Sequence, residues 1–133
     1  MSKIFVFGSN LSGRHGRGAA KFAREHYGAI YGQATGLQGD SFAIPTKDEK
    51  LNTLSLDRIK KYVEAFLMFA QQNPEYEFQL TNIGCGLAGY LPADIAPMFK
   101  DAPENVIQSK EFLLHHKVIE ALEKYWLPIK KEN

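Results

Sequence analysis

Hydrophobic residues in this chain occur in two patterns: short continuous runs, and longer stretches in which they recur every three or four positions. A short apolar run is typical of a buried strand, whereas recurrence at helical spacing indicates a helix with one buried face. The runs predict strands at residues 3–8, 42–45, 77–83 and 105–108. The helical spacing predicts helices at residues 17–27, 56–72, 92–100 and 110–126.

Residues that begin and end helices support these boundaries. Ser55 is a suitable N-cap for the second predicted helix, and Pro74 stops that helix. Gly28 suits the left-handed position after the first helix, and Pro92 suits the first turn of the third. Residues 29–41 are rich in glycine and polar side chains, so we expect an irregular segment there.

Strands and helices therefore alternate along the whole chain. This alternation predicts a single α/β domain over residues 1–133, with a mainly parallel central sheet between two helical layers. The expected fold class is a three-layer α-β-α sandwich. In such sheets, ligands bind at the carboxyl ends of the strands, where the winding direction reverses.

Composition limits the classes of partner. With 44% hydrophobic and 23% charged residues, the chain resembles an ordinary soluble globular protein. A net charge of +1 predicts no general attraction to nucleic acid or to an anionic membrane. Cys85 is the only cysteine, which excludes an internal disulfide and fits a reducing compartment. No signal peptide or apolar run of bilayer length is visible, so we expect a cytoplasmic protein.

Two glycine-rich segments each follow a predicted strand and precede a predicted helix. The first glycine loop, residues 10–18, contains Gly13, Gly16 and Gly18 together with the basic residues Arg14 and Arg17. The second glycine loop, residues 83–90, contains Gly84, Gly86 and Gly89. Glycine allows a ligand to approach the main chain closely, and backbone amides at a helix N-terminus favour an anion. The pair of loops therefore predicts a phosphate-bearing ligand.

The ligand argument also predicts the strand order. If the first and third predicted strands are central neighbours, both glycine loops converge on one crevice. We therefore expect the order second, first, third, fourth. A Rossmann dinucleotide site does not fit, because its acidic residue ends the second strand, whereas Asp40 precedes that strand here.

Polar side chains near the strand ends are candidates for chemistry. Asn10 can bond a sugar hydroxyl or its own loop backbone, and the local role is favoured. His15 can act as a general acid or base, although a solvated or phosphate-contacting imidazole is the favoured interpretation. Lys47 can reach a phosphate and Asp48 can act as a base, or both can be solvated loop charges.

The second glycine loop adds two candidates. Cys85 is a nucleophile or, as we favour, a small buried residue, because no histidine partner is identifiable. Tyr90 is a candidate to stack on a base, whereas core packing is favoured for Phe42. No histidine or cysteine spacing is typical of a metal site, and no cofactor is expected.

Read together, these residues resemble a macro domain, the ADP-ribose-binding fold. Asn10-x-x-Gly13, continuing through Gly16 and Gly18 to Ala19-Ala20, resembles the first ligand loop of that family. The diphosphate-binding loop of the family resembles Ile83-Gly84-Cys85-Gly86-Leu87-Ala88-Gly89. Within the family, this loop sequence is most similar to the branch that includes the terminal ADP-ribose glycohydrolases and the antitoxins that remove ADP-ribose from DNA. The resemblance covers roughly residues 4–108.

The resemblance implies that ADP-ribose or a related nucleotide diphosphate binds between the two loops. The implied contacts are Asn10, Gly13, Arg14, Gly16 and Gly18 in the first loop and Gly84, Cys85, Gly86, Leu87, Ala88, Gly89 and Tyr90 in the second. Two features differ from the family pattern. The first predicted strand, residues 3–8, resembles the strand that follows the family's adenine-reading aspartate, and Ala88 stands where the glycohydrolase branch has an aspartate.

Two alternatives stay open at this point. One is a hydrolase that removes ADP-ribose from a modified protein or nucleic acid, with Asn10, His15 or Asp48 assisting the attacking water. The other is a non-catalytic protein that sequesters a nucleotide or takes part in an interaction.

Overall fold

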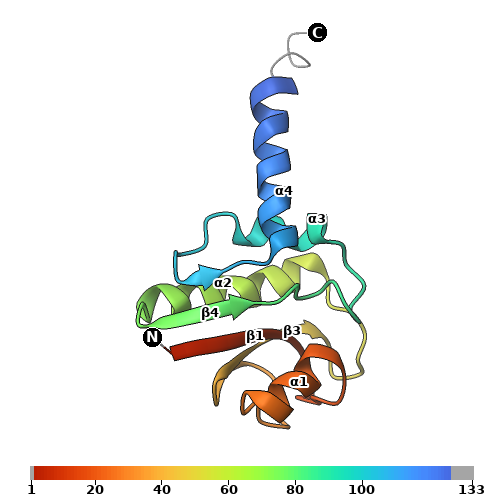
Figure 1. Cartoon of the computed structure of the whole chain (residues 1–133). Helices are drawn as coiled ribbons and strands as arrows, with labels where there is room; N and C mark the ends of the chain where they lie inside the picture. Colours follow the sequence, from red (N-terminus) through yellow and green to blue (C-terminus); the bar gives the residue numbers. More distant parts are fainter. Residues whose placement is uncertain (1, 127–133) are drawn as a thin grey trace.

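The computed structural model describes residues 2–126 and shows an α/β chain with a mixed sheet (Figure 1). Its strands are β1 (Ser2–Asn10), β2 (Gly36–Gln38), β3 (Ser41–Lys47), β4 (Tyr76–Leu80) and β5 (Val106–Ile107). Its helices are α1 (Gly18–His26), α2 (Leu56–Gln72), α3 (Pro92–Ile95) and α4 (Lys110–Ala121). A 3₁₀ turn, η1 (Ala96–Phe99), follows α3, and a π-helical turn, η2 (Leu122–Trp126), follows α4.

The sheet has the strand order β2-β3-β1-β4-β5. β1 pairs in parallel with both β3 and β4, and β4 pairs in parallel with β5. The predicted order of the four main strands is therefore confirmed. β2 was not predicted: it lies in the segment expected to be irregular and adds an antiparallel edge to β3.

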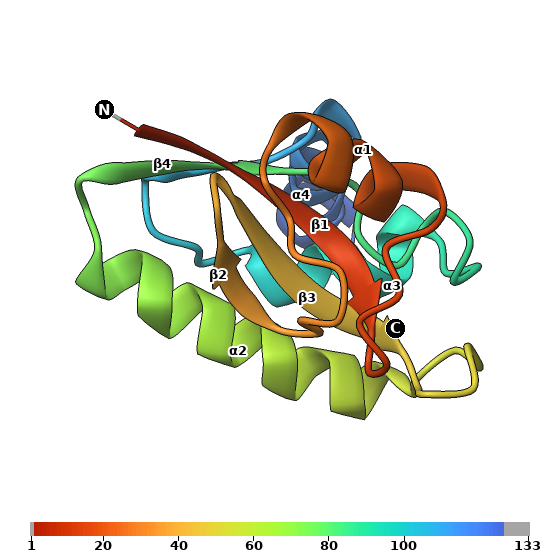
Figure 2. The ribbon, with the colours of Figure 1, turned by 90° about the horizontal axis from the view of Figure 1, so that it is seen from below.

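Side chains of β1 point alternately to the two faces of the sheet. Ile4 and Val6 belong to the larger core, together with buried residues of α2, whereas Phe7 packs with Ala20 and Ala23 of α1. The period of two along a strand accounts for this division. α1 and α2 consequently lie on opposite faces of the sheet, as Figure 2 shows.

Local signals set most helix boundaries. α2 has the predicted bounds, and the Ser55 side chain accepts a hydrogen bond from the amide of Arg58 at 3.3 Å. Gly28 has a φ of +73°, as expected after α1. The helix predicted at 92–100 is instead the short α3 followed by η1.

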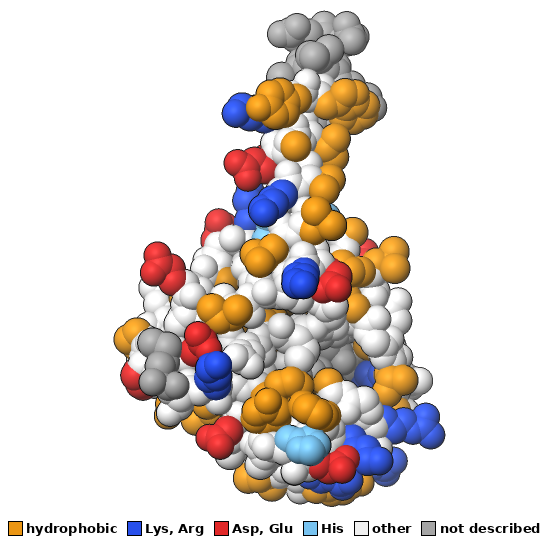
Figure 3. Space-filling model, viewed as in Figure 1, with side chains coloured by type: hydrophobic (Ala, Val, Ile, Leu, Met, Phe, Trp, Pro, Cys, Tyr) orange, Lys and Arg blue, Asp and Glu red, His pale blue; other side chains and the backbone are white. Residues whose placement is uncertain are grey.

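α4 projects away from the sheet (Figure 1). Ser109 caps it by accepting a hydrogen bond from the amide of Phe112 at 3.2 Å, and Phe112 anchors its first turn in the core. Figure 3 shows hydrophobic side chains along this helix, where Leu114 and Val118 are exposed. Among residues 2–126, no helix has the length and apolar character needed to cross a membrane.

Candidate functional site

A cavity of about 720 Å³ lies at the carboxyl ends of β1, β3 and β4. Its volume falls within the range typical of small-molecule sites. Its walls are formed by residues 8–10, Arg14, 16–20, Tyr31, Thr46, Lys47, Leu51 and 81–88. Most of both glycine loops therefore faces a single cavity.

The sheet topology explains why the loops meet. β1 lies between β3 and β4 and runs parallel to both, so the segments after these strands leave the same edge of the sheet. The loops also come close to each other, because a Cβ added at Gly18 would lie 3.7 Å from Cδ1 of Leu87. The predicted convergence is thus present in the structure.

The charge of the cavity wall is positive. Arg14, Arg17 and Lys47 line it, and in the part of the chain that the structure describes no Asp or Glu does so. α1 begins at the same wall, and the Arg17 side chain makes no capping hydrogen bond to its first turn. The free amides of a helix N-terminus carry partial positive charge and attract anions. This wall is therefore suited to a phosphate group.

Asn10 holds the first glycine loop together. Its Oδ1 accepts hydrogen bonds from the Arg14 amide at 2.9 Å and from Oγ of Ser12 at 2.7 Å. Its Nδ2 donates to the Arg14 carbonyl at 2.8 Å. The favoured local role is confirmed. Asn10 lines the cavity, but its amide is engaged in positioning Arg14.

Gly13 does not line the cavity and is buried behind the loop. Its φ is +71°, and an added Cβ would lie 2.4 Å from the carbonyl carbon of Gly32. No other residue fits this close approach without a shift of backbone. Gly13 therefore shapes the first glycine loop from behind the cavity wall, and its direct contact with a ligand stays a prediction.

His15 is fully buried, so the expectation of a solvated or phosphate-contacting imidazole is wrong. Its Nε2 lies 3.0 Å from the Gln33 carbonyl and 3.1 Å from Oε1 of Gln38. That Oε1 also accepts from the Ile30 amide at 2.8 Å, so Nε2 of His15 is the donor in these contacts. The ring packs edge-on against Phe7 at 5.2 Å. His15 is a structural link between the first glycine loop and β2, not a residue of the cavity wall.

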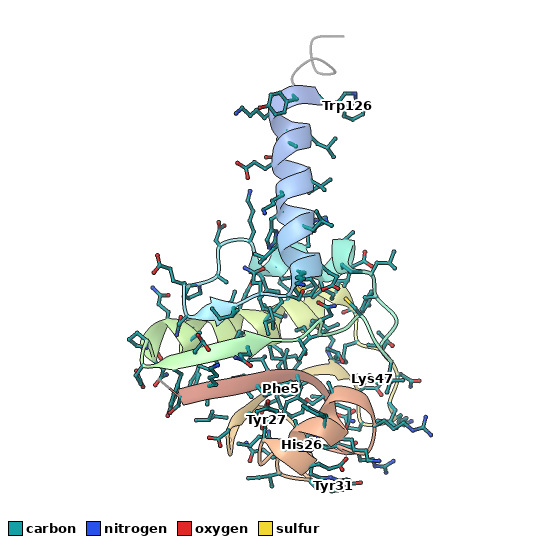
Figure 4. The ribbon with its side chains drawn as sticks, in the orientation of Figure 1. Phe5, His26, Tyr27, Tyr31, Lys47 and Trp126 are labelled. Carbon is teal, nitrogen blue, oxygen red and sulfur yellow. The ribbon has the colours of Figure 1, made fainter. Side chains whose placement is uncertain are left out.

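Asp48 turns away from the cavity and closes its own loop. Its Oδ1 accepts hydrogen bonds from the amides of Asn52 and Lys50, both at 2.9 Å. The bonds to Asn52 and Lys50 lower the pKa of the Asp48 carboxyl. A carboxylate of lowered basicity outside the cavity does not suit a general base. The neighbouring Lys47, by contrast, lies in the cavity wall (Figure 4).

The second glycine loop lines the cavity only as far as Ala88. Residues 84–88 line the cavity, whereas Gly89 and Tyr90 do not. The Tyr90 hydroxyl donates to the Leu54 carbonyl at 2.7 Å, and its ring packs against the main core. In this structure the Tyr90 ring supports the loop from behind, and stacking of Tyr90 on a base stays a prediction.

Cys85 lies in the cavity wall as a neutral thiol. Burial, together with the negative charge of Asp94, raises the pKa of this thiol. The favoured interpretation as a small, partly buried residue is consistent with both effects.

Several wall residues were not singled out from the sequence. Ser9 and Thr81 end or follow strands of the sheet, and polar side chains at strand ends were the available signal. Asn82 also lines the wall, and its Oδ1 is buried without a hydrogen-bond partner. Tyr31 comes from the segment expected to be irregular, where no periodicity could indicate which side chain reaches the cavity.

Among residues 2–126, no group of three His, Cys, Asp or Glu side chains is placed to hold a metal ion. Comparison of the chain with protein-family models, curated proteins and solved structures gave no match. The site is therefore interpreted from its own geometry and charge.

Proposed function

We propose that this protein binds ADP-ribose or a related nucleotide diphosphate in the cavity between its two glycine loops. The single observation that carries the proposal is the cavity wall, to which the described residues contribute Arg14, Arg17 and Lys47 but no carboxylate. Guanidinium groups form paired hydrogen bonds to phosphate oxygens, and an ammonium adds a point charge. We extend the proposal to the fold, which we interpret as a macro-domain-like three-layer α-β-α sandwich.

The backbone of both loops supports a diphosphate. Gly16 and Gly86 have open space where a Cβ would stand, so a ligand atom can approach their main chain. The N-terminus of α1 lies in the same wall and favours negative charge. In this proposal the second glycine loop and the start of α1 hold the diphosphate from two sides.

Isothermal titration calorimetry at low salt tests the proposal with ADP-ribose, ADP, NAD and inorganic pyrophosphate. We expect binding of the diphosphates, with affinity that falls as salt is added because charge is neutralised in the complex. A double variant, Arg14→Gln with Arg17→Gln, should lose most of this affinity. No binding of any of the four compounds at millimolar concentration would refute the proposal.

Hydrolysis of an ADP-ribosylated protein or nucleic acid is not favoured by any specific observation. The polar atoms of Asn10 hold its own loop, His15 is buried behind that loop, and Asp48 closes a turn outside the cavity. Binding without turnover is the activity that the arrangement supports best. Incubation with an ADP-ribosylated protein, followed by assay of released ADP-ribose, distinguishes the two.

A further inference from the structure

We propose that Tyr31 is the platform on which the base of the bound nucleotide stacks. The inference rests on the proposed function and adds a specificity-determining residue to it. Among residues 2–126, Tyr31 is the only aromatic side chain that lines the cavity, and 57% of its surface is exposed. It lies outside both glycine loops, on the segment between α1 and β2 (Figure 4).

The Tyr31 ring is held in place before any ligand binds. The Arg24 guanidinium lies 5.6 Å from the ring centroid, and the ring of His15 lies 6.4 Å away at an interplanar angle of 73°. A cation against an aromatic ring attracts it through the ring quadrupole. These neighbours restrain the ring while more than half of its surface stays open.

The backbone on both sides of Tyr31 is equally constrained. The Ile30 amide donates to Oε1 of the buried Gln38 at 2.8 Å, and the Gly32 amide donates to the Gly13 carbonyl at 2.8 Å. These two hydrogen bonds constrain the backbone on both sides of Tyr31, and with it the direction of the Tyr31 Cα–Cβ bond. The exposure of Tyr31 is therefore a feature of an ordered segment, and an ordered ring loses little conformational entropy when a base stacks on it.

The chemistry of the wall favours a base as the group that meets Tyr31. The cationic side chains and the start of α1 suit the phosphates of the ligand. The Tyr31 ring therefore suits the uncharged, planar part of the ligand. Base–aromatic stacking contributes about 1–3 kcal/mol per base in single-stranded nucleic-acid complexes. Tyr31 lines the same cavity as Arg17 and Ala20 at the start of α1, so both parts of a nucleotide share one site.

Calorimetry with Tyr31→Ala, Tyr31→Phe and the matched control Tyr125→Ala tests the inference. Tyr125 is an exposed tyrosine of η2 and does not line the cavity. We expect Tyr31→Ala to weaken ADP binding about tenfold or more and pyrophosphate binding less than twofold, since only ADP carries a base. Tyr31→Phe and Tyr125→Ala should bind both compounds like the unmodified protein.

A comparison of ADP with UDP adds a readout that a purely structural role would not change. Purines offer more stacking surface, so the unmodified protein should prefer ADP and Tyr31→Ala should lose most of that preference. Equal loss of ADP and pyrophosphate binding in Tyr31→Ala, or unchanged ADP binding, would overturn the inference without refuting the proposed function, which is judged on the unmodified protein. Failure of the unmodified protein to bind ADP-ribose, ADP, NAD and pyrophosphate at millimolar concentration would refute the proposed function itself, and this inference with it.

Discussion

The Gly32 amide donates a hydrogen bond to the Gly13 carbonyl at 2.8 Å, and a Cβ at Gly13 would lie 2.4 Å from the carbonyl carbon of Gly32. This contact joins the first glycine loop to the segment that carries Tyr31. Together with the contact of His15 Nε2 with the Gln33 carbonyl, this backbone contact links the positive side of the cavity to its aromatic side, and it depends on the absence of a side chain at Gly13.

Gly13→Ala should therefore destabilise the folded protein. The substitution imposes a positive φ of +71° on an alanine and drives its Cβ into backbone, which cannot move as a flexible side chain can. We expect a loss of about 2–4 kcal/mol in the free energy of unfolding, measured by urea denaturation.

The matched control for that substitution is Gly16→Ala in the same loop. An added Cβ there would meet no atom within 4 Å, so we expect a change in stability within about 0.5 kcal/mol. Equal stability of the two variants would contradict the backbone contact as the reason for a glycine at position 13.

Gln38→Met should also lower the free energy of unfolding. Gln38 is buried, and its Oε1 accepts from Nε2 of His15 and from the Ile30 amide. Methionine keeps the approximate volume but leaves both donors without this acceptor. We expect a cost of about 2–3 kcal/mol by urea denaturation, whereas Gln71→Met on the exposed side of α2 should change little. A cost below about 0.5 kcal/mol for Gln38→Met would show that these donors find other partners.

The fold could be predicted from the sequence where local patterns determine it. The bounds of α2 follow from helical spacing between a serine cap and a proline, and the parallel order of the main strands follows from the two glycine loops. β2 could not be predicted, because its three residues are too few to show the alternation of polar and apolar positions by which a strand is recognised. Its pairing with β3 is a contact that the sequence pattern does not reveal. The third predicted helix ends early for a local reason, because Pro97 has no amide hydrogen to continue the α-helix, and the chain goes on after Ile95 as the 3₁₀ turn η1.

The site was predictable to the level of segments, and less so at single residues. Both glycine loops reach the cavity, but the burial of His15 and Tyr90 depends on partners distant in sequence, Gln38 and Leu54. Sequence reasoning identifies a residue that is able to do chemistry. Whether that side chain faces the cavity or packs behind the loop depends on its hydrogen-bond partners, which lie far away in the sequence and close by in the fold.

Arg17→Gln should weaken the binding of ADP-ribose without affecting stability. Arg17 is exposed and lies in the cavity wall at the start of α1, where its charge adds to that of the helix amides. We expect an affinity about three- to tenfold lower at low salt and a weaker dependence of affinity on salt.

Arg58→Gln provides the control, because Arg58 is an exposed arginine of α2 outside the cavity wall. It removes the same charge from the chain as Arg17→Gln. If the two variants bind ADP-ribose alike, net charge and not a local contact governs the affinity.

Cys85 should react slowly with iodoacetamide at pH 8, because the thiolate is the reactive form and burial and the charge of Asp94 raise the pKa of this thiol. We expect slower alkylation in the folded protein than in urea, with a rate that rises at higher pH than for an ordinary cysteine. Since the pKa of Cys85 is raised in the folded protein, its contribution to the free energy of unfolding is fully present below the ordinary thiol pKa. That contribution is lost as the pH rises through the raised pKa.

Asp94→Asn keeps an acceptor for the Leu91 amide but removes the charge, so alkylation of Cys85 should become faster, whereas Asp57→Asn on α2 should not change its rate. Because Cys85 is the only cysteine and lines the cavity, bound ADP-ribose should slow alkylation further. Protection by ADP-ribose that is equal in urea and in buffer would contradict a folded binding site at this thiol.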